Sequence, residues 1–196
     1  MVGARGGDPA DRDLALGLVA GEAWAMAETW NRFAPMVLMT ARRALGSRTE
    51  AEDVAQEVFL AVFRKARTLR DPDSLRSFIY SFAVRVLKAE LRRRKLRGWM
   101  PFMPEATVDF GFLTLDVESR DLLRKLYAFL DRLSPRVRLA FILRRMEAMT
   151  VEEIAATMNI SISTVKRAIA HASARLSRWM DADPGLALLR QERGEA

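Results

Sequence analysis

The 196-residue chain contains no cysteine and a single histidine, His171. Without cysteine it can form no disulfide and no thiolate zinc site, and it has no thiol nucleophile. One histidine excludes histidine-rich metal sites and leaves room for a single histidine-dependent catalytic pair. P-loop and HExxH motifs are also absent. We therefore expect a protein that is not an enzyme, with no catalytic residue, no metal and no cofactor.

Long hydrophobic runs are missing too, since no stretch approaches the ~20 uncharged apolar residues of a membrane-spanning helix. The first 13 residues are rich in glycine and charge and do not resemble a targeting signal. We expect no membrane insertion and a cytoplasmic location. Hydrophobic residues make up 50% of the chain and charged residues 29%, a balance that is typical of a folded, soluble protein.

Positive charge is in excess. The 32 Lys and Arg residues exceed the 25 Asp and Glu residues by 7, and the pI is about 10.5. A basic protein of this kind favours polyanionic partners. Nucleic acid is our first expectation, an anionic membrane surface the second and small acidic substrates the third.

Helical spacing dominates the first half of the chain. Glycine and proline are scarce between residues 14 and 97, and apolar residues recur at intervals of three and four. The pattern predicts an all-α fold. The expected boundaries are an end near Gly21, a break or kink at Pro35, an end at Gly46, a start capped by Ser47 or Thr49, an end near Ala66 and a last helix over 75–97.

The end of that last helix is strongly basic and is followed by an acidic stretch. Residues 98–119 contain four acids, no Lys and no Arg, and include Pro101, Pro104 and Gly111. We interpret this stretch as a flexible acidic linker, and expect the two flanking domains to tumble almost independently. The basic run either contacts a polyanion or forms a solvated face; its cations are Arg85, Lys88, Arg92, Arg93, Arg94, Lys95 and Arg97.

Helical spacing returns over 120–180 and predicts four helices. The segment from Thr150 to Leu176 fits a helix-turn-helix, with Thr150 and Glu153 as a capping box and Asn159 in the left-handed conformation of the turn. The predicted domain layout is a disordered N-terminus over 1–10, a first domain over 11–97, the linker over 98–119, a helix-turn-helix domain over 120–180 and a tail over 181–196.

The second helix of this motif presents a polar and basic strip, comprising Ser163, Thr164, Lys166, Arg167, Ala170 and His171. Such a strip is suited to the major groove of DNA. The alternative is a plain helical hairpin with a solvated basic face. His171 reads a base or is a spectator, and the sequence favours neither.

Both halves of the chain resemble one known family. The residues Leu133 to Arg136, Thr150 to Ala155 and Ser163 to Lys166 resemble region 4 of bacterial sigma-70-type initiation factors, particularly the extracytoplasmic-function (ECF) group. Residues 50–60 (EAEDVAQEVFL) resemble the region 2 helix of that family. Residues 77–80 (SFIY), Ala83 and the run 91–94 (LRRR) resemble its promoter-melting helix.

This resemblance implies a transcription initiation factor that binds core RNA polymerase and promoter DNA, melts the promoter, and has an anti-sigma factor as a further partner. It assigns region 2 to residues 11–97 and region 4 to residues 120–180. The implied contacts are Asp53, Gln56 and Glu57 with polymerase; Phe78, Tyr80, Arg85, Lys88, Arg92 and Arg93 with the minus-10 element; and Ser163, Thr164, Lys166, Arg167 and His171 with the minus-35 element.

Alternatives remain open at this point. Phe78 and Tyr80 fit core packing at least as well as base stacking, because aromatic side chains mostly bury area. The whole chain could also be a stand-alone helix-turn-helix repressor or activator with an N-terminal helical dimerisation domain. Such a repressor has no need of the acidic cluster at Asp53 to Glu57, and would bind duplex DNA without polymerase. A helical hydrolase has almost no support.

Overall fold

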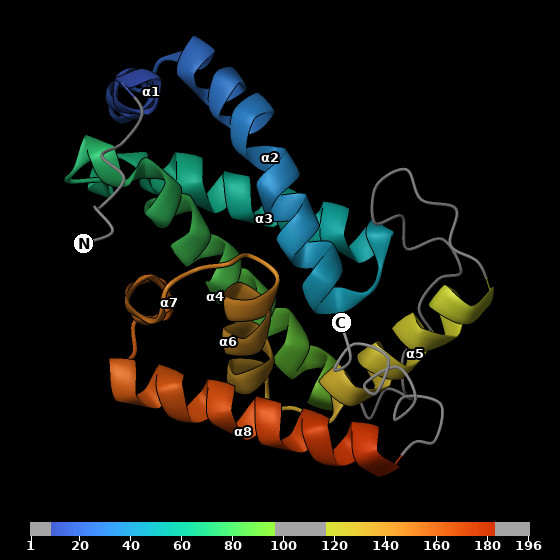
Figure 1. Cartoon of the computed structure of the whole chain (residues 1–196). Coiled ribbons are helices and arrows are strands. Elements are labelled where there is room, and N and C mark those ends of the chain that lie inside the picture. The colour runs from blue at the N-terminus through green and yellow to red at the C-terminus, as the bar shows by residue number, and fades with distance from the viewer. Residues whose placement is uncertain (1–8, 97–116, 183–196) are drawn as a thin grey trace.

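The computed structural model describes residues 9–96 and 117–182, and these residues form helices without any strand (Figure 1). The all-α prediction is confirmed. The elements are α1 Pro9–Ala20, α2 Ala23–Leu45, α3 Arg48–Lys65, the short 3-10 helices η1 Ala66–Thr68 and η2 Pro72–Ser74, α4 Leu75–Leu96, α5 Val117–Asp131, α6 Pro135–Arg145, α7 Val151–Met158 and α8 Ile162–Ala182.

Several predicted segments lie wholly or mainly outside the described residues: most of the N-terminus, the linker up to residue 116, and the tail after residue 182. Where they overlap, the structure shifts the boundaries. α1 begins at Pro9, inside the stretch predicted as disordered, and α5 begins at Val117, inside the predicted linker. α8 continues to Ala182, one residue past Asp181. None of the described helices combines the length and apolar content needed to cross a bilayer.

The turn between α2 and α3 forms as its residues predict. Gly46 ends α2 in the left-handed region, with φ of 72°, and its N–H donates to the carbonyl of Arg42 at 2.7 Å. The Ser47 hydroxyl then accepts from the N–H of Glu50 at 3.3 Å and caps α3.

The sequence predicts a break or a kink at Pro35, and of these two alternatives the break is wrong. Pro35 lies inside α2, which continues from Ala23 to Leu45, and its own side chain is exposed. Proline removes one backbone donor from the helix. The neighbouring Phe33, Ala34 and Val37 are buried against the other helices, so tertiary packing holds α2 together through this position.

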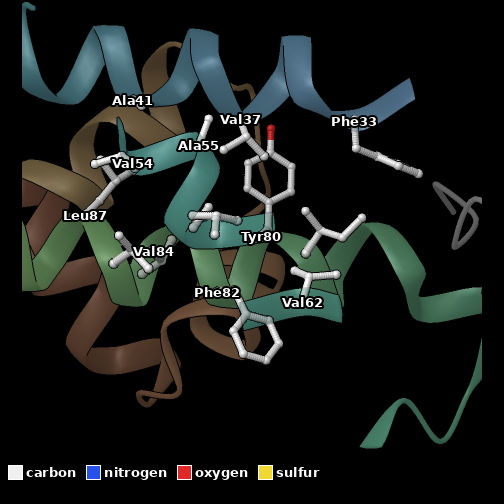
Figure 2. Close-up of a cluster of buried hydrophobic side chains, with 14 of the residues drawn as sticks. Phe33, Val37, Ala41, Val54, Ala55, Val62, Tyr80, Phe82, Val84 and Leu87 are labelled. Carbon is white, nitrogen blue, oxygen red and sulfur yellow. The ribbon is translucent and has the colours of Figure 1, made fainter. Parts of the chain in front are cut away.

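Helices α1 to α4 form the first helical unit. α2 packs on α3, α3 packs on α4, and α1 lies against α2 and the 3-10 turns. Figure 2 shows part of the resulting core, with Val37 and Ala41 from α2, Val54 from α3, and Val84 and Leu87 from α4.

Helices α5 to α8 form the second unit. α6 packs along α8, and α7 joins them through the helix-turn-helix. A separate cluster of buried side chains lies at the far end of this unit, where the rings of Phe129 and Trp179 stack at 5.6 Å between centroids. Tyr127, Leu130, Leu133, Phe141 and Ala172 complete its buried members.

The two units pack against each other, contrary to the expectation that they tumble independently. α4 lies against α6 and α7, and α2 lies against α6 (Figure 1). One continuous hydrophobic cluster contains side chains of both units, including Leu139 and Ile142 of α6 and Ile154 of α7 together with the core of α1 to α4. The free energy gained by burying these apolar faces exceeds the entropic free energy that the two units would gain by moving independently.

Candidate nucleic-acid and polymerase interfaces

Local side-chain bonds build the helix-turn-helix. The Thr150 hydroxyl accepts from the N–H of Glu153 at 3.1 Å, and the Thr150 N–H donates to the Glu153 carboxylate at 2.7 Å. This capping box starts α7. Asn159 ends it in the left-handed region, with φ of 51°. The predicted capping box and turn conformation are both confirmed.

α8 divides into a buried and an exposed face. Val165, Ala168 and Ala172 are buried. On the opposite side Ser163, Lys166, Arg167 and His171 are exposed. Thr164 is half-buried, and its hydroxyl lies 2.8 Å from the Ser161 hydroxyl and 3.5 Å from the guanidinium of Arg167. We refer to Ser163, Lys166, Arg167 and His171 as the α8 strip.

The predicted minus-10 residues of α4 are not equally accessible. Arg85, Arg92 and Arg93 are exposed, whereas Phe78 and Lys88 are half-buried. The Phe78 ring meets Phe82 edge-on at 5.0 Å, and the Arg85 guanidinium lies 4.9 Å from the centroid of Phe82.

Tyr80 is buried, with 3% of its surface exposed, and its hydroxyl points toward α2 (Figure 2). The hydroxyl donates to the carboxylate of Glu147, in the loop between α6 and α7, at 3.3 Å. Burial, and secondly the negative charge of Glu147, raise the pKa of Tyr80 above its usual value. The ring is therefore not presented to a base in this arrangement, which corrects the expectation of an accessible stacking residue.

The basic run at the end of α4 is also divided. Arg94 is not a DNA-facing cation: its side chain is 12% exposed, forms an ion pair with Glu50, and donates to the carbonyl of Leu45 at 2.9 Å. Burial, together with the positive charge of Arg138, lowers the pKa of Arg94 to about 10. Arg94 therefore stabilises the junction of α2, α3 and α4.

Cations of the two units meet beside α4. Burial, followed by the positive charges of Arg92 and of Arg136 on α6, lowers the pKa of Lys88. Positive charges from both units therefore act on Lys88. A bound polyanion at this position would relieve their repulsion.

The predicted polymerase contacts share the exposed face of α3. Asp53, Gln56 and Glu57 are all exposed, and the structure adds Leu60, which is 55% exposed. Sequence reasoning missed Leu60, although its spacing of four residues from Gln56 places it on that face. The Glu57 carboxylate also lies 3.8 Å from the Arg93 guanidinium, so the acidic face of α3 adjoins the basic end of α4.

Comparisons with known proteins bear on both units. Residues 29–97 match the family model described as Sigma-70 region 2, and residues 123–176 match the model described as Sigma-70, region 4. The chain is 35% identical over 138 residues to the ferric citrate uptake sigma factor FecI of Escherichia coli, covering 66% of this chain and 76% of FecI. It is 25% identical to the ECF RNA polymerase sigma factor SigM of Mycobacterium tuberculosis, covering 87% and 84% of the two chains.

A solved structure, CnrH in complex with the cytosolic domain of CnrY, is similar with a TM-score of 0.65 at 25% identity. The similarity covers 89% of this chain and 99% of CnrH, and so includes both helical units. A repressor with a dimerisation domain does not explain matches to regions 2 and 4 in this order. The chain belongs to the ECF group of the sigma-70 family, and is an RNA polymerase sigma factor that directs core polymerase to promoters.

Proposed function

We propose that the three exposed faces divide the work of promoter recognition: the acidic face of α3 docks on core polymerase, α4 meets the minus-10 element, and the α8 strip reads the minus-35 element. The observation that carries this proposal is the two-sided character of α8. Its small apolar residues are buried, and its first turns present polar and basic side chains outward.

Within the α8 strip, Arg167 is the base reader. Its planar guanidinium can donate to both major-groove acceptors of a guanine, which is worth about 1–3 kcal/mol of discrimination. Its position near the Thr164 hydroxyl restrains the direction in which it extends. Lys166 neutralises a phosphate, which adds affinity and salt dependence without sequence information. His171 lies about one turn further along the helix and contributes least to recognition.

This division is tested with holoenzyme on a promoter library. Arg167→Ala should relax the base preference at one or two minus-35 positions. Lys166→Ala should weaken all sequences alike and reduce the salt dependence of binding. Arg175→Ala, an exposed cation further along α8, is the matched control. An unchanged preference at every minus-35 position in Arg167→Ala would show that the proposed register of α8 is wrong.

At α3, we propose that Asp53, Gln56 and Glu57 face a basic surface of core polymerase and that Leu60 is buried on docking. Charge complementarity guides such encounters, and buried apolar area adds affinity. The double variant Asp53→Lys/Glu57→Lys should lose capture by core polymerase.

A control variant with the same change of charge tests position rather than net charge. Asp13→Lys/Glu28→Lys changes two exposed acids of α1 and α2. It should bind polymerase as well as the wild type. Equal binding by both double variants, with both folded by circular dichroism, would overturn this docking face.

We propose that α4 favours melted DNA without covalent chemistry. A base stacked on the half-exposed Phe78 would contribute about 1–3 kcal/mol, and Arg85 and Arg92 would follow the backbone of the single strand. Phe78→Ala should therefore reduce open-complex formation with little effect on binding of closed duplex promoter.

We also propose a cytoplasmic location, where core polymerase acts, and regulation by an anti-sigma factor. The second proposal is supported by the solved relative CnrH, which is in complex with the cytosolic domain of CnrY. A regulator of this kind should compete with core polymerase for the chain. Simultaneous binding of both, detected as a ternary complex by size-exclusion chromatography, would contradict that role.

A further inference from the structure

A single carboxylate in the α6–α7 loop bridges the two units. The Glu147 side chain is 10% exposed, and one of its oxygens accepts from an Arg43 guanidinium nitrogen at 3.0 Å. The other oxygen accepts from the Tyr80 hydroxyl at 3.3 Å. The same Arg43 nitrogen donates to the carbonyl of Met146 at 2.8 Å. Residues of α2 and α4 thus hold a loop of the helix-turn-helix unit.

The backbone beside Glu147 is held in a strained conformation. Ala148 has φ of 53°, in the left-handed region that disfavours a residue with a Cβ. The N–H groups of Met146 and Glu147 donate to the carbonyl of Ile142, and the N–H of Met149 donates to that of Leu143. Strain of this kind persists only where surrounding contacts over-determine the chain, and such positions are frequent at switches.

The bridge lies where the helix-turn-helix unit packs against α4. With the loop in place, α6 and α7 lie against α4, and Tyr80 is buried. The α8 strip lies on the exposed side of its helix and stays accessible. The arrangement therefore covers part of α4 and leaves the strip on α8 open.

We propose that Glu147 is an interdomain latch, which holds the chain in a closed form until the helix-turn-helix unit separates from α4. The charged and titratable groups around it are Arg43 from α2, Tyr80 from α4 and Arg76, whose guanidinium lies 5.9 Å from the Tyr80 ring. Opening breaks the contacts of Glu147 and exposes Tyr80 with the neighbouring surface of α4. The functional consequence rests on the proposed role of α4 in minus-10 binding.

The latch is tested by measuring the distance between the two units in the free, full-length protein. Because the chain has no cysteine, Ala27→Cys on α2 and Ala174→Cys on α8, both exposed, give two unique spin-label sites. Double electron–electron resonance then resolves closed and open populations. A salt series keeps both populations measurable, since salt screens the ion pair.

Glu147→Gln should raise the open-to-closed ratio roughly 5- to 30-fold, the effect of losing a partly buried, hydrogen-bonded charge pair. Glu152→Gln, an exposed glutamate five positions away, is the matched control and should leave the ratio unchanged. The charge exchange Arg43→Glu/Glu147→Arg should recover most of the closed population lost in Arg43→Glu alone. A wild type that is already open, or a Glu147→Gln ratio equal to that of the control, overturns the latch.

A second readout separates the latch from the role of α4. Fluorescence anisotropy with a labelled single-stranded DNA of mixed sequence, about 12 nucleotides long, measures how well the free chain binds a melted strand. Glu147→Gln should bind it more tightly by a factor similar to its change in the open population. A shift in the distance distribution without tighter DNA binding leaves the latch intact and overturns the proposed minus-10 role of the covered surface of α4.

Discussion

Replacement of Gly46 by alanine tests whether the two units are packed together in solution. Gly46 ends α2 with φ of 72°. A Cβ at this position would lie 2.9, 3.0 and 3.2 Å from three carbon atoms of the Tyr127 ring, which belongs to the other unit. That ring is buried, and its hydroxyl donates to the carbonyl of Arg42 at 3.0 Å. It therefore has little freedom to move aside.

Two contributions make up the expected loss. The left-handed conformation costs a residue with a Cβ about 1–2 kcal/mol. The close approach to Tyr127 is overpacking, which typically adds about 1–3 kcal/mol. We expect Gly46→Ala to lower the free energy of unfolding by about 2–5 kcal/mol. At the upper end of this range, the contact with Tyr127 of the second unit accounts for more than half of the loss.

Gly21→Ala is a matched control within the same chain. Gly21 follows α1 with φ of 81°, and a Cβ there meets no atom within 4 Å. It should lose only the conformational contribution of about 1–2 kcal/mol. Urea denaturation of both variants, followed by circular dichroism, gives the difference directly.

Equal losses in the two glycine variants would refute the packing of Tyr127 on the end of α2. The double variant Gly46→Ala/Tyr127→Leu provides a second check. Relative to Tyr127→Leu alone, Gly46→Ala should then destabilise the protein no more than Gly21→Ala does, because the smaller side chain can give way.

Three further measurements probe the buried polar groups and the strained loop. Burial raises the pKa of both tyrosines of the chain, that of Tyr127 to about 12, so the tyrosine pKa values from an absorbance titration of the folded protein should exceed those measured in urea. Because the unfolded chain loses these protons at lower pH, the free energy of unfolding should fall as the pH rises from about 10 to 12. Ala148→Gly should raise the free energy of unfolding by about 1 kcal/mol in urea denaturation, because glycine accepts the left-handed conformation; no gain would contradict the strain. Thr29→Val should also stabilise the protein by about 1 kcal/mol, because the buried Thr29 hydroxyl has no hydrogen-bond partner among the described residues. Thr40→Val removes a hydrogen bond to the carbonyl of Met36 and should not stabilise the protein, so equal effects of the two variants would refute the argument.

The features that the sequence predicts well are local. Thr150, Glu153 and Asn159 lie within ten positions of one another, and their side-chain and backbone preferences act through hydrogen bonds over three or four residues. The same holds for Gly46 and Ser47 between α2 and α3. Such signals act without the tertiary structure, so the ends of α2 and α7 and the starts of α3 and α7 follow from them.

The packing of the two units against each other could not be predicted from such local signals. Arg43 and Glu147 are 104 positions apart, and Tyr127 reaches a carbonyl 85 positions away. Linker composition alone favours independent domains, because it carries no information about complementary apolar faces. Pro35 shows the same limit on a smaller scale, since burial of its neighbours decides that α2 continues.

Burial also decides which members of a charged or aromatic group remain available as candidate contacts. In the basic run, the sequence does not distinguish Arg94, which is held by Glu50 and the carbonyl of Leu45, from the exposed Arg93. Tyr80 is likewise buried, and its hydroxyl donates to Glu147, in a loop distant in sequence. The individual contact residues of the candidate interfaces remain predictions for the experiments proposed above.

The cover that α7 places on α4 has a consequence for apparent affinity. For any ligand that requires the covered surface, the observed dissociation constant equals the intrinsic one divided by the fraction of chains that are open. If about 1% of free chains were open, such a ligand would bind roughly 100-fold more weakly than to an open chain. A partner that keeps the two units apart removes this factor, so single-stranded DNA and that partner would each strengthen the binding of the other, although they need never touch.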